Sequence, residues 1–170
     1  MGAPLRIDSR QQMGKHVTKN KWFAAHGVET VTVKLDTGDY AYAPSNILID
    51  TKKDVDELAM DCGKDHRRFV NELDRAAASG CRLVILVEQH PEFNDRENLK
   101  SWLGYSCRRC RKCDPNAGDK CRLRRFTPMH GERLAKILDT LERKHHARFR
   151  FCTKRDTARI ICETLGIDYE

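Results

Sequence analysis

The chain has 170 residues and a formal net charge of +7, because 32 Lys and Arg residues outnumber 25 Asp and Glu residues. This length suits one compact domain with a sizeable core and excludes two comfortable ones. The charge favours a polyanionic partner such as nucleic acid over a membrane surface, since no basic amphipathic anchor is evident, although charge alone leaves an ordinary basic protein open. No apolar signal region and no apolar run of about 18 residues occur, which predicts a soluble intracellular protein.

Hydrophobic patterning predicts alternating strands and helices along the chain. A short strand at 4–8 is followed by a helix at 15–27 that ends in glycine, and then by a strand at 28–35 in which valines alternate with polar residues. Turns rich in Gly and Pro then flank two further strands, at 39–43 and 47–52. The close succession of the strands at 28–35, 39–43 and 47–52 predicts a meander.

The rest of the chain continues the alternation. Residues 54–78 show apolar residues at helical spacing with a break at Gly63, and 81–89 is an almost uninterrupted apolar strand of the kind covered on both faces. An amphipathic helix, an alternating strand and a last helix are predicted at 131–146, 147–153 and 155–166. We therefore expect a mixed α/β sheet with helices on both sides.

The apolar strand at 47–52 ends in an unusual way, because its last three residues are Asp50, Thr51 and Lys52. On a strand, Asp50 and Lys52 project to one side and Thr51 to the other. The turn that precedes this strand can bring Asp39 alongside Asp50. Two neighbouring carboxylates repel unless a cation lies between them, which indicates a divalent-metal site with an amine beside it. A solvated strand end, with Asp39 as a turn former, is the alternative that spacing leaves open.

A resemblance to a known family follows from four ordered stretches: RIDSRQ, HGVETVTVKLDTGDYAYAP, ILIDTKKDVDEL and RRFVNELDRAAASGCRLVILVE. Together they resemble the nuclease domain of the XPF family of structure-specific endonucleases, which belongs to the PD-(D/E)xK, restriction-enzyme-like superfamily. The family pattern is a V-D-x-R-E strand, a G-D-Y turn, a strand ending in E-R-K, a long helix and a buried strand ending in Glu. Asp8 and Arg10 match the first motif, Asp39 the second, and Asp50 and Lys52 the third.

The resemblance also includes the closing helix, strand and helix, so that it covers nearly the whole chain apart from residues 100–126. Three positions depart from the family pattern: Gln11 stands where Glu is usual, Asp50 replaces Glu, and Thr51 replaces Arg. The helix-hairpin-helix domain that usually follows the nuclease does not occur within these 170 residues.

The resemblance implies a single restriction-endonuclease-like domain over 1–170 that hydrolyses DNA with the help of Mg²⁺ or Mn²⁺. Asp39 and Asp50 would hold the metal, with Asp8 nearby through water, and Lys52 would position the attacking water. Three glutamates are weaker candidates for the same site: Glu57, Glu72 and Glu88.

The resemblance further implies a substrate and an assembly. The substrate would be branched, flapped or otherwise structured DNA in repair or recombination, with Arg10 among the DNA contacts. A homodimer or a heterodimer would form through the nuclease domain, and the amphipathic helices at 131–146 and 155–166 agree with such pairing. A non-catalytic DNA-binding module, in which Gln11 and Thr51 mark a decayed site, and a nuclease acting on RNA or on DNA ends stay open as alternatives.

Residues 100–126 have little apolar periodicity and are interpreted as an insertion with a metal staple. Four of the eight cysteines lie here with the spacing C-x2-C-x2-C-x7-C: Cys107, Cys110, Cys113 and Cys121. Four thiolates in a short loop suit a tetrahedral Zn²⁺ site, whose binding energy would fold a segment with no core of its own. An iron–sulfur cluster, or a reduced loop without metal, is left open.

The same insertion carries an excess of positive charge, since eight Lys or Arg residues lie between positions 107 and 125 against two acids. A metal-stapled loop of this charge would clamp a phosphate backbone, although the arginines would also offset thiolate charge. The residues predicted to contact DNA here are Arg108, Arg109, Arg111, Lys112, Arg122, Arg124 and Arg125.

Overall fold

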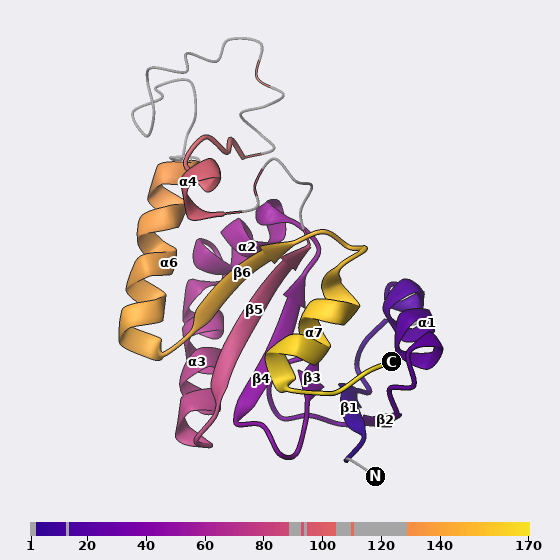
Figure 1. Cartoon of the computed structure of the whole chain (residues 1–170). Helices are drawn as coiled ribbons and strands as arrows, with labels where there is room; N and C mark the ends of the chain where they lie inside the picture. The colour runs from indigo at the N-terminus through magenta and orange to yellow at the C-terminus, as the bar shows by residue number, and fades with distance from the viewer. Residues whose placement is uncertain (1–2, 13, 89–92, 94, 105–109, 111–128) are drawn as a thin grey trace.

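A six-stranded mixed sheet forms the centre of the molecule, whose computed structural model describes residues 3–12, 14–88, 93, 95–104, 110 and 129–170 (Figure 1). Its strands are β1 (Leu5–Asp8), β2 (Thr30–Val33), β3 (Tyr40–Ala41), β4 (Ile47–Lys52), β5 (Arg82–Glu88) and β6 (Arg148–Cys152). Their order in the sheet is β2-β1-β3-β4-β5-β6, and β3 runs antiparallel to both of its neighbours whereas the other pairings are parallel. Consequently the carboxyl ends of β1, β4, β5 and β6 meet the beginning of β3 at one edge of the sheet.

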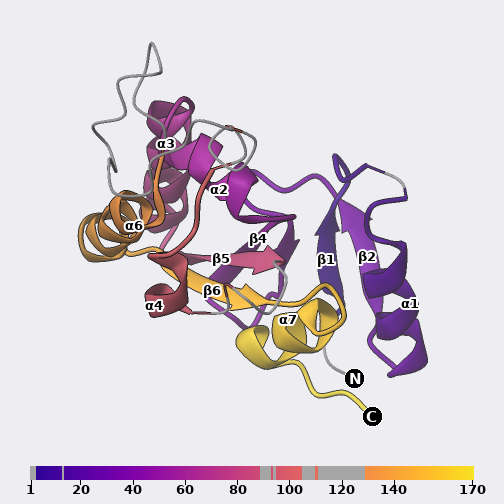
Figure 2. The ribbon, with the colours of Figure 1, turned by 90° about the horizontal axis from the view of Figure 1, so that it is seen from above.

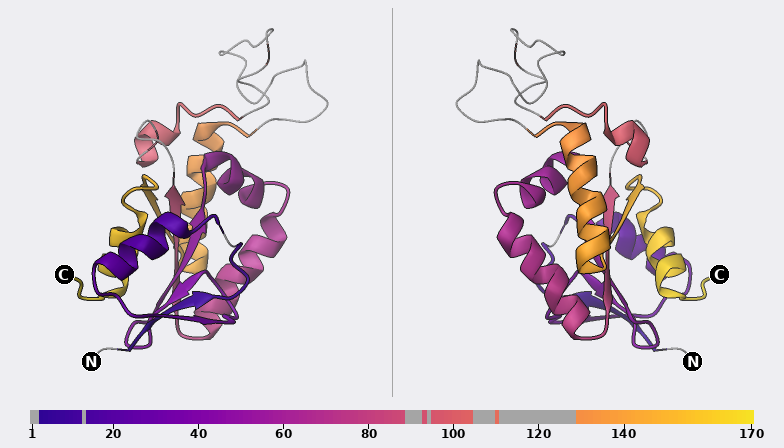
Figure 3. Two further views of the ribbon diagram at one scale, coloured as in Figure 1. Left: turned by 90° about the vertical axis from the view of Figure 1, so that its right-hand side faces the viewer. Right: turned by 90° about the vertical axis from the view of Figure 1, so that its left-hand side faces the viewer.

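Helices cover both faces of this sheet, as Figure 2 and Figure 3 show. The helices on one face are α2 (Val55–Cys62), α3 (His66–Ala78) and α6 (Gly131–His145), and the short α4 (Arg96–Leu99) packs against α6. The helices on the other face are α1 (Val17–Ala25) and α7 (Thr157–Leu165). In the described part of the chain, none of these helices combines the length and the apolar character that a membrane crossing requires.

Strand β5 separates two hydrophobic cores, as its uninterrupted apolar sequence predicts. Leu83, Ile85 and Val87 face the core under α2, α3 and α6, whereas Val84 and Leu86 face the core under α1 and α7. All five side chains are at most 3% exposed. A strand buried on both faces cannot alternate apolar with polar residues, which explains its sequence.

The predicted break at Gly63 is confirmed, because α2 ends at Cys62 and α3 begins at His66. Helix α2 begins where the Asp54 side chain accepts a hydrogen bond from the Glu57 amide at 2.8 Å. This cap satisfies one of the amides that a helix leaves unpaired in its first turn.

The predicted meander is wrong in its order, because β1 lies between β2 and β3. Residues 5–8 pair in parallel with β2 through the crossover helix α1, and β2 is left at the edge with its residues mostly exposed. Alternation of valines identifies a strand but not its partners, so the sequence did not show that β1 lies between β2 and β3. The short α4 also escaped prediction, since four residues carry too little periodicity.

The two ends of the predicted insertion lie next to each other in the fold. Leu103 forms an isolated antiparallel bridge with His130, and the Gly131 amide donates to the Trp102 carbonyl at 2.9 Å. Trp102 and the preceding Leu99 are buried in the core under α6. The sheet and its helices are therefore continuous on both sides of residues 105–128.

Gly38 fixes the turn that delivers the chain into β3. Its φ of +77° lies in the region that favours glycine, and a Cβ at this position would lie 2.9 Å from the Ile49 carbonyl oxygen. The next residue, Asp39, donates its amide to that same carbonyl at 2.6 Å. The glycine thus allows Asp39 to pair closely with β4.

We expect Gly38→Ala to lower the free energy of unfolding by at least about 1 kcal/mol more than Gly80→Ala, because the methyl group must displace backbone of β4. Gly80 is a matched control, since its φ is +75° and nothing lies within 4 Å of an added Cβ. Chemical denaturation of both variants measures the difference. Equal losses in the two variants would show that the close approach to Ile49 carries no cost.

Candidate active site

The end of β4 places Asp50 and Lys52 on the face covered by α2, and Thr51 on the opposite side. Lys52 Nζ lies 2.8 Å from Asp50 Oδ2 and 2.8 Å from Asp61 Oδ2 of α2. All three side chains are at most 12% exposed. Apart from Lys52, no hydrogen-bond donor in the described part of the chain reaches either of these carboxylate oxygens.

Asp61 is a site residue that the sequence did not reveal. Arg68 of α3 binds its second carboxylate oxygen at 3.2 Å, so that Asp61 connects Lys52 with α3. Burial alone would lower the pKa of Lys52, but Asp50 and Asp61 raise it above its usual range. The amine is therefore charged. The sequence does contain a signal for Asp61 that was not used: it is an acid on the buried side of α2, three residues after Leu58.

Asp50 has an unfavourable environment for a negative charge. Burial raises its pKa most, Asp39 and Glu72 add to that effect and Lys52 opposes it, so that the pKa of Asp50 is about 7. Glu72 of α3 is half-buried and contributes charge to this region, although its sequence suggested a solvated helix residue. A further cation near this carboxyl would lower its pKa and stabilise its charged form, because the nearby acids disfavour that charge.

Asp39 lies at the beginning of β3, next to the end of β4. Its Oδ2 accepts hydrogen bonds from the Thr51 amide at 2.9 Å and from the Thr51 hydroxyl at 2.5 Å. Thr51, which stands where the family has Arg, thus fixes the orientation of Asp39. The two carboxylates predicted to share a metal, Asp39 and Asp50, lie at the same sheet edge and interact electrostatically.

Asp8 is buried at the end of β1, where it lines the groove beside Asp39 and also has hydrogen-bond partners. Its Oδ1 accepts from the Leu35 amide at 3.0 Å and its Oδ2 from Arg10 Nε at 2.8 Å, while Arg10 Nη2 donates to the Leu35 carbonyl at 2.5 Å. Both oxygens of Asp8 therefore hold the loop after β2. Gln11 donates its side-chain amide to the Asp39 carbonyl at 3.3 Å, a bond that the usual Glu, as a carboxylate, would not make.

A groove of about 580 Å³ runs along this edge on the side of α1. Asp39 and Thr51 line it together with Glu57 and Glu88, and its basic residues are Arg10, Lys15, His16, Lys53 and Lys154. Glu88 at the end of β5 forms a buried ion pair with Lys19 of α1 at 2.5 Å. Burial, reinforced by the charge of Lys19, lowers the pKa of His16, which favours its neutral form.

The residues of the site divide between the two faces of the sheet. Asp39, Glu57 and Glu88 face the groove, whereas Asp50 and Lys52 lie under α2. Within the described residues, no group of three or more His, Cys, Asp or Glu side chains is arranged to hold a metal ion. Asp39 and Asp50, the two predicted metal ligands, therefore lie at one sheet edge but on different faces, and a Mg²⁺ ion shared between them stays a prediction. Mg²⁺ is satisfied by one or two carboxylates plus water and phosphate oxygens.

The predicted zinc and clamp residues cannot be placed in this geometry. Cys107, Cys113 and Cys121 lie outside the described residues, and Cys110 is half-buried with a free thiol. The predicted clamp residues that also lie outside are Arg108, Arg109, Arg111, Lys112, Arg122, Arg124 and Arg125. Arg10 is described, and its side chain is 56% exposed beside Asp8.

A model of one family, the ERCC4 domain, matches residues 7–164 of the chain. The chain belongs to the ERCC4 domain family. Solved structures with the same fold include XPF from Aeropyrum pernix, with 16% sequence identity and a TM-score of 0.58, over 95% of this chain and 64% of that one. XPF from Aeropyrum pernix in complex with DNA matches with 17% identity, a TM-score of 0.58, and 96% and 64% coverage. A comparison with curated proteins finds no significant match.

These comparisons confirm the resemblance to the XPF nuclease domain and the mixed α/β fold that it implied. The ERCC4 domain here spans 64% of the length of the solved XPF chains. Because the sequence identity is low, the solved structures show only that the fold is the same, whereas the family model shows that the chain belongs to the family.

The raised pKa of Asp50 predicts that its charge destabilises the fold at neutral pH. The folded state holds the proton up to about pH 7, whereas the unfolded state releases it near the ordinary value of 3.8. Relative to an ionised Asp50, the protonated carboxyl stabilises the fold. This stabilisation is fully present below about pH 4 and is lost as the pH rises through 7. Asp50→Asn should raise the free energy of unfolding at pH 7 relative to the unchanged chain, and the gain should shrink toward pH 4.

Urea denaturation between pH 4 and pH 8 measures this effect in the absence of divalent metal. Asp36→Asn is the control, because Asp36 is exposed in the turn before Gly38. A variant with Asn at position 50 that is less stable than the unchanged chain at pH 7 would contradict the assigned environment.

Proposed function

We propose that this ERCC4 domain is a metal-dependent DNA endonuclease. The observation that carries the proposal is the pairing of buried Asp50 and Lys52 at the end of β4, with Asp39 at the same sheet edge. A buried, unfavourable carboxylate next to a charged amine is typical of a catalytic site rather than of a structural strand end. Membership of the family supports the same function.

Asp39 and Asp50 would hold Mg²⁺ or Mn²⁺. When bound, the metal would polarise the phosphodiester and lower the pKa of a bound water. The excess of acids around Asp50 and its raised pKa fit such a cation, since the cation would restore the ionised carboxylate. Asp8 lines the groove beside Asp39 and would lie near the metal through water, while its two oxygens also hold Arg10 and the Leu35 amide.

Lys52 would act as a hydrogen-bond donor. Its pKa is raised by Asp50 and Asp61, so that it stays protonated and is unsuited to remove a proton from water. A fixed ammonium group orients the attacking water and stabilises the negative charge that develops on the phosphate. Asp61 and Arg68 position this amine.

The substrate is proposed to be branched, flapped or otherwise structured DNA, as in repair or recombination. The groove beside Asp39 carries four exposed or half-exposed bases that suit a phosphate backbone: Arg10, Lys15, Lys53 and Lys154. A solved relative, XPF from Aeropyrum pernix, was determined in complex with DNA. A nuclease acting on RNA or on DNA ends is the second candidate, and the same groove would serve it.

Pairing of two nuclease domains stays a prediction from the family resemblance. The apolar sides of α6 and α7, which seemed available for a partner, are buried within the chain: Leu134, Leu138 and Leu141 in one core and Ala158, Ile161 and Leu165 in the other. The amphipathic pattern of these helices is thus explained by internal packing and no longer indicates a dimer interface.

Loss of the metal ligands should abolish cleavage while leaving DNA binding in place. We expect Asp39→Asn and Asp50→Asn to remove activity, and Lys52→Ala to reduce the rate about 100-fold or more. Cleavage with Mg²⁺ of single-stranded, duplex, flap and four-way substrates measures these effects and identifies the preferred substrate. Asp36→Asn is the matched control and should cleave normally. Unchanged cleavage by the Asp50→Asn protein would contradict the site, and a panel in which nothing is cut would favour the non-catalytic module.

The cysteine-rich insertion is proposed to bind one Zn²⁺ through Cys107, Cys110, Cys113 and Cys121 and to clamp the DNA backbone. The support is the spacing of the four cysteines and their accompanying basic residues. The bridge between Leu103 and His130 closes the fold at the base of this segment. The core is therefore expected to fold whether or not the metal is present.

Replacing Cys107 and Cys121 with Ser should eliminate the zinc while the thermal unfolding of the core stays nearly unchanged. Elemental analysis should find one zinc per chain in the unchanged protein and no visible absorption of an iron–sulfur cluster. Replacing the scattered Cys81, which is half-buried elsewhere, serves as the control. Less than about a tenth of an equivalent of zinc or iron in fresh reduced protein would contradict the metal site. Unchanged DNA affinity in the double variant would contradict the clamp alone.

A further inference from the structure

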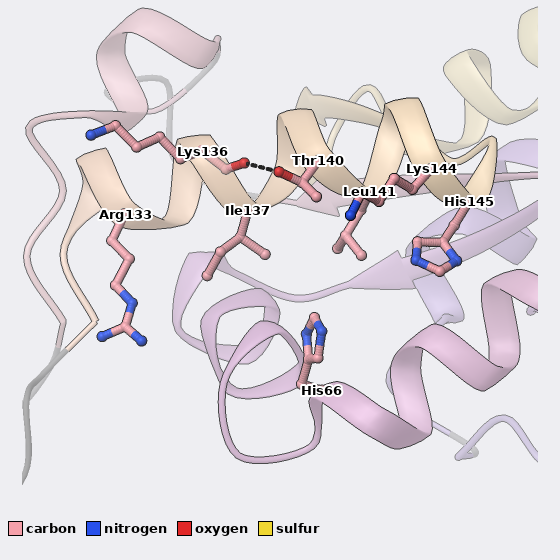
Figure 4. A pocket seen from close by; sticks show the side chains of 8 residues that line it. All are labelled: His66, Arg133, Lys136, Ile137, Thr140, Leu141, Lys144 and His145. Carbon is pink, nitrogen blue, oxygen red and sulfur yellow. Dashed lines mark hydrogen bonds between the residues drawn. The ribbon is translucent and has the colours of Figure 1, made fainter.

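A second pocket, of about 420 Å³, lies between α6 and the beginning of α3 (Figure 4). Its lining comprises His66 from α3 and seven residues from α6: Arg133, Lys136, Ile137, Thr140, Leu141, Lys144 and His145. Arg133 and His145 extend from α6, and His66 extends from α3 toward them, as Figure 4 shows. None of the residues that line this α3–α6 groove is acidic.

The charges of α6 are sorted between its two sides. Asp139 and Glu142 face α4, where Arg96 binds them at 3.3 Å and 3.0 Å. On the side of α3, Arg133, Lys136 and Lys144 are exposed and form no ion pair with any carboxylate in the described part of the chain. Three unpaired positive charges on one side of a helix repel one another and attract a polyanion.

The acids nearest to the groove lie at its ends or outside it. Asp74 of α3 accepts from His145 Nδ1 at 2.6 Å and so closes the end near the C-terminus of α6. Glu132, in the first turn of α6, is exposed and does not line the pocket. Asp65, directly before His66, binds Arg68 at 3.8 Å, and Asp139 binds Arg96. No acid is among the residues that line the groove around Lys136 and Thr140.

The length of the groove matches a nucleic-acid strand. Arg133 and Lys144 are eleven residues apart, which corresponds to about 16 Å along the helix axis. One strand of duplex DNA carries about five phosphates over that distance. Ile137 and Thr140 are partly buried and Arg133, Lys136 and Lys144 are exposed, so that a backbone can contact the charged side chains without base contacts.

The groove lies on the same sheet face as Asp50 and Lys52. Helix α3 begins at His66 in the groove, and its Arg68 binds Asp61, which in turn binds Lys52. No residue of the groove lines the catalytic groove beside Asp39. The two surfaces therefore flank the end of β4 from opposite faces of the sheet.

We propose that the α3–α6 groove binds the phosphate backbone of duplex DNA, as a contact additional to the catalytic groove. This proposal rests on the proposed DNA endonuclease function. Its contacts are charge-based and independent of base sequence, so they hold a duplex arm of the substrate without selecting a sequence. The groove contributes to affinity and not to the chemical step, because it contains none of the acids or amines at the strand end.

The test compares two variants with the same change in net charge. The groove variant is Arg133→Gln, Lys136→Gln and Lys144→Gln in one chain. The control variant is Lys21→Gln, Lys34→Gln and Arg143→Gln, three exposed bases outside both grooves, the last of them on α6 itself. Binding to a labelled duplex is measured without Mg²⁺ at several NaCl concentrations, and cleavage is measured with Mg²⁺ at saturating DNA.

We expect the groove variant to bind at least about tenfold more weakly at low salt. The negative slope of its log affinity against log salt should become shallower by about 2 to 3, about one unit for each lost phosphate contact. The control should change the slope by less than about 1. Cleavage at saturating DNA should be the same in all three proteins, and circular dichroism should show equal folding.

Equal losses of affinity in the two variants would overturn the proposal, since net charge alone would then explain them. An unchanged slope in a folded groove variant would overturn it as well. Either result leaves the endonuclease function standing, because the unchanged chain still binds and cuts DNA. If the unchanged chain neither binds nor cuts any DNA, the endonuclease function fails, and the groove proposal fails with it.

Discussion

Lys52 lies between two buried carboxylates, Asp50 of β4 and Asp61 of α2, and the packing at this edge of the sheet depends on it. A buried carboxylate without a partner would cost several kcal/mol, and Lys52 supplies that partner to Asp50. Arg68 extends the same set of ion pairs to α3. Burial, together with the charges of Asp39 and Glu72, nevertheless outweighs the amine and raises the pKa of Asp50. The fold thus maintains an unfavourable charge where a divalent cation would relieve it.

Two of the three departures from the family pattern, Gln11 and Thr51, have hydrogen-bond partners on Asp39. Thr51 binds Asp39 through its backbone amide, which any residue here would supply, and through its hydroxyl, which an arginine lacks. Gln11 donates to the carbonyl of the same residue. Both substitutions therefore orient Asp39 instead of leaving a gap. Thr51 contacts the carboxylate of Asp39 and Gln11 its backbone carbonyl, so both replacements meet at the same residue.

Electrostatic sorting extends from the site to the surface. Acids collect at the sheet edge, where their charge is held by Lys52, Arg10 and Lys19. Bases that form no ion pair within the described residues line the groove between α6 and α3, while Asp139 and Glu142 of α6 are paired with Arg96. A polyanionic strand would be attracted to the surface and repelled from the acids at the edge unless a metal neutralised them. Binding and cleavage are for that reason expected to respond differently to salt and to Mg²⁺.

The sequence by itself determined the alternation of Asp50, Thr51 and Lys52, the double burial of β5 and the break at Gly63, because each depends on residues close together in the chain. It also determined the family, since the motifs keep their order along the chain. The tertiary structure decided which distant segments contact one another. In it, β1 lies between β2 and β3, Asp61 binds Lys52, and Asp8 accepts hydrogen bonds from Leu35 and Arg10. Strand partners and side-chain contacts of this kind arise from packing across the sheet, and no local periodicity carries that information.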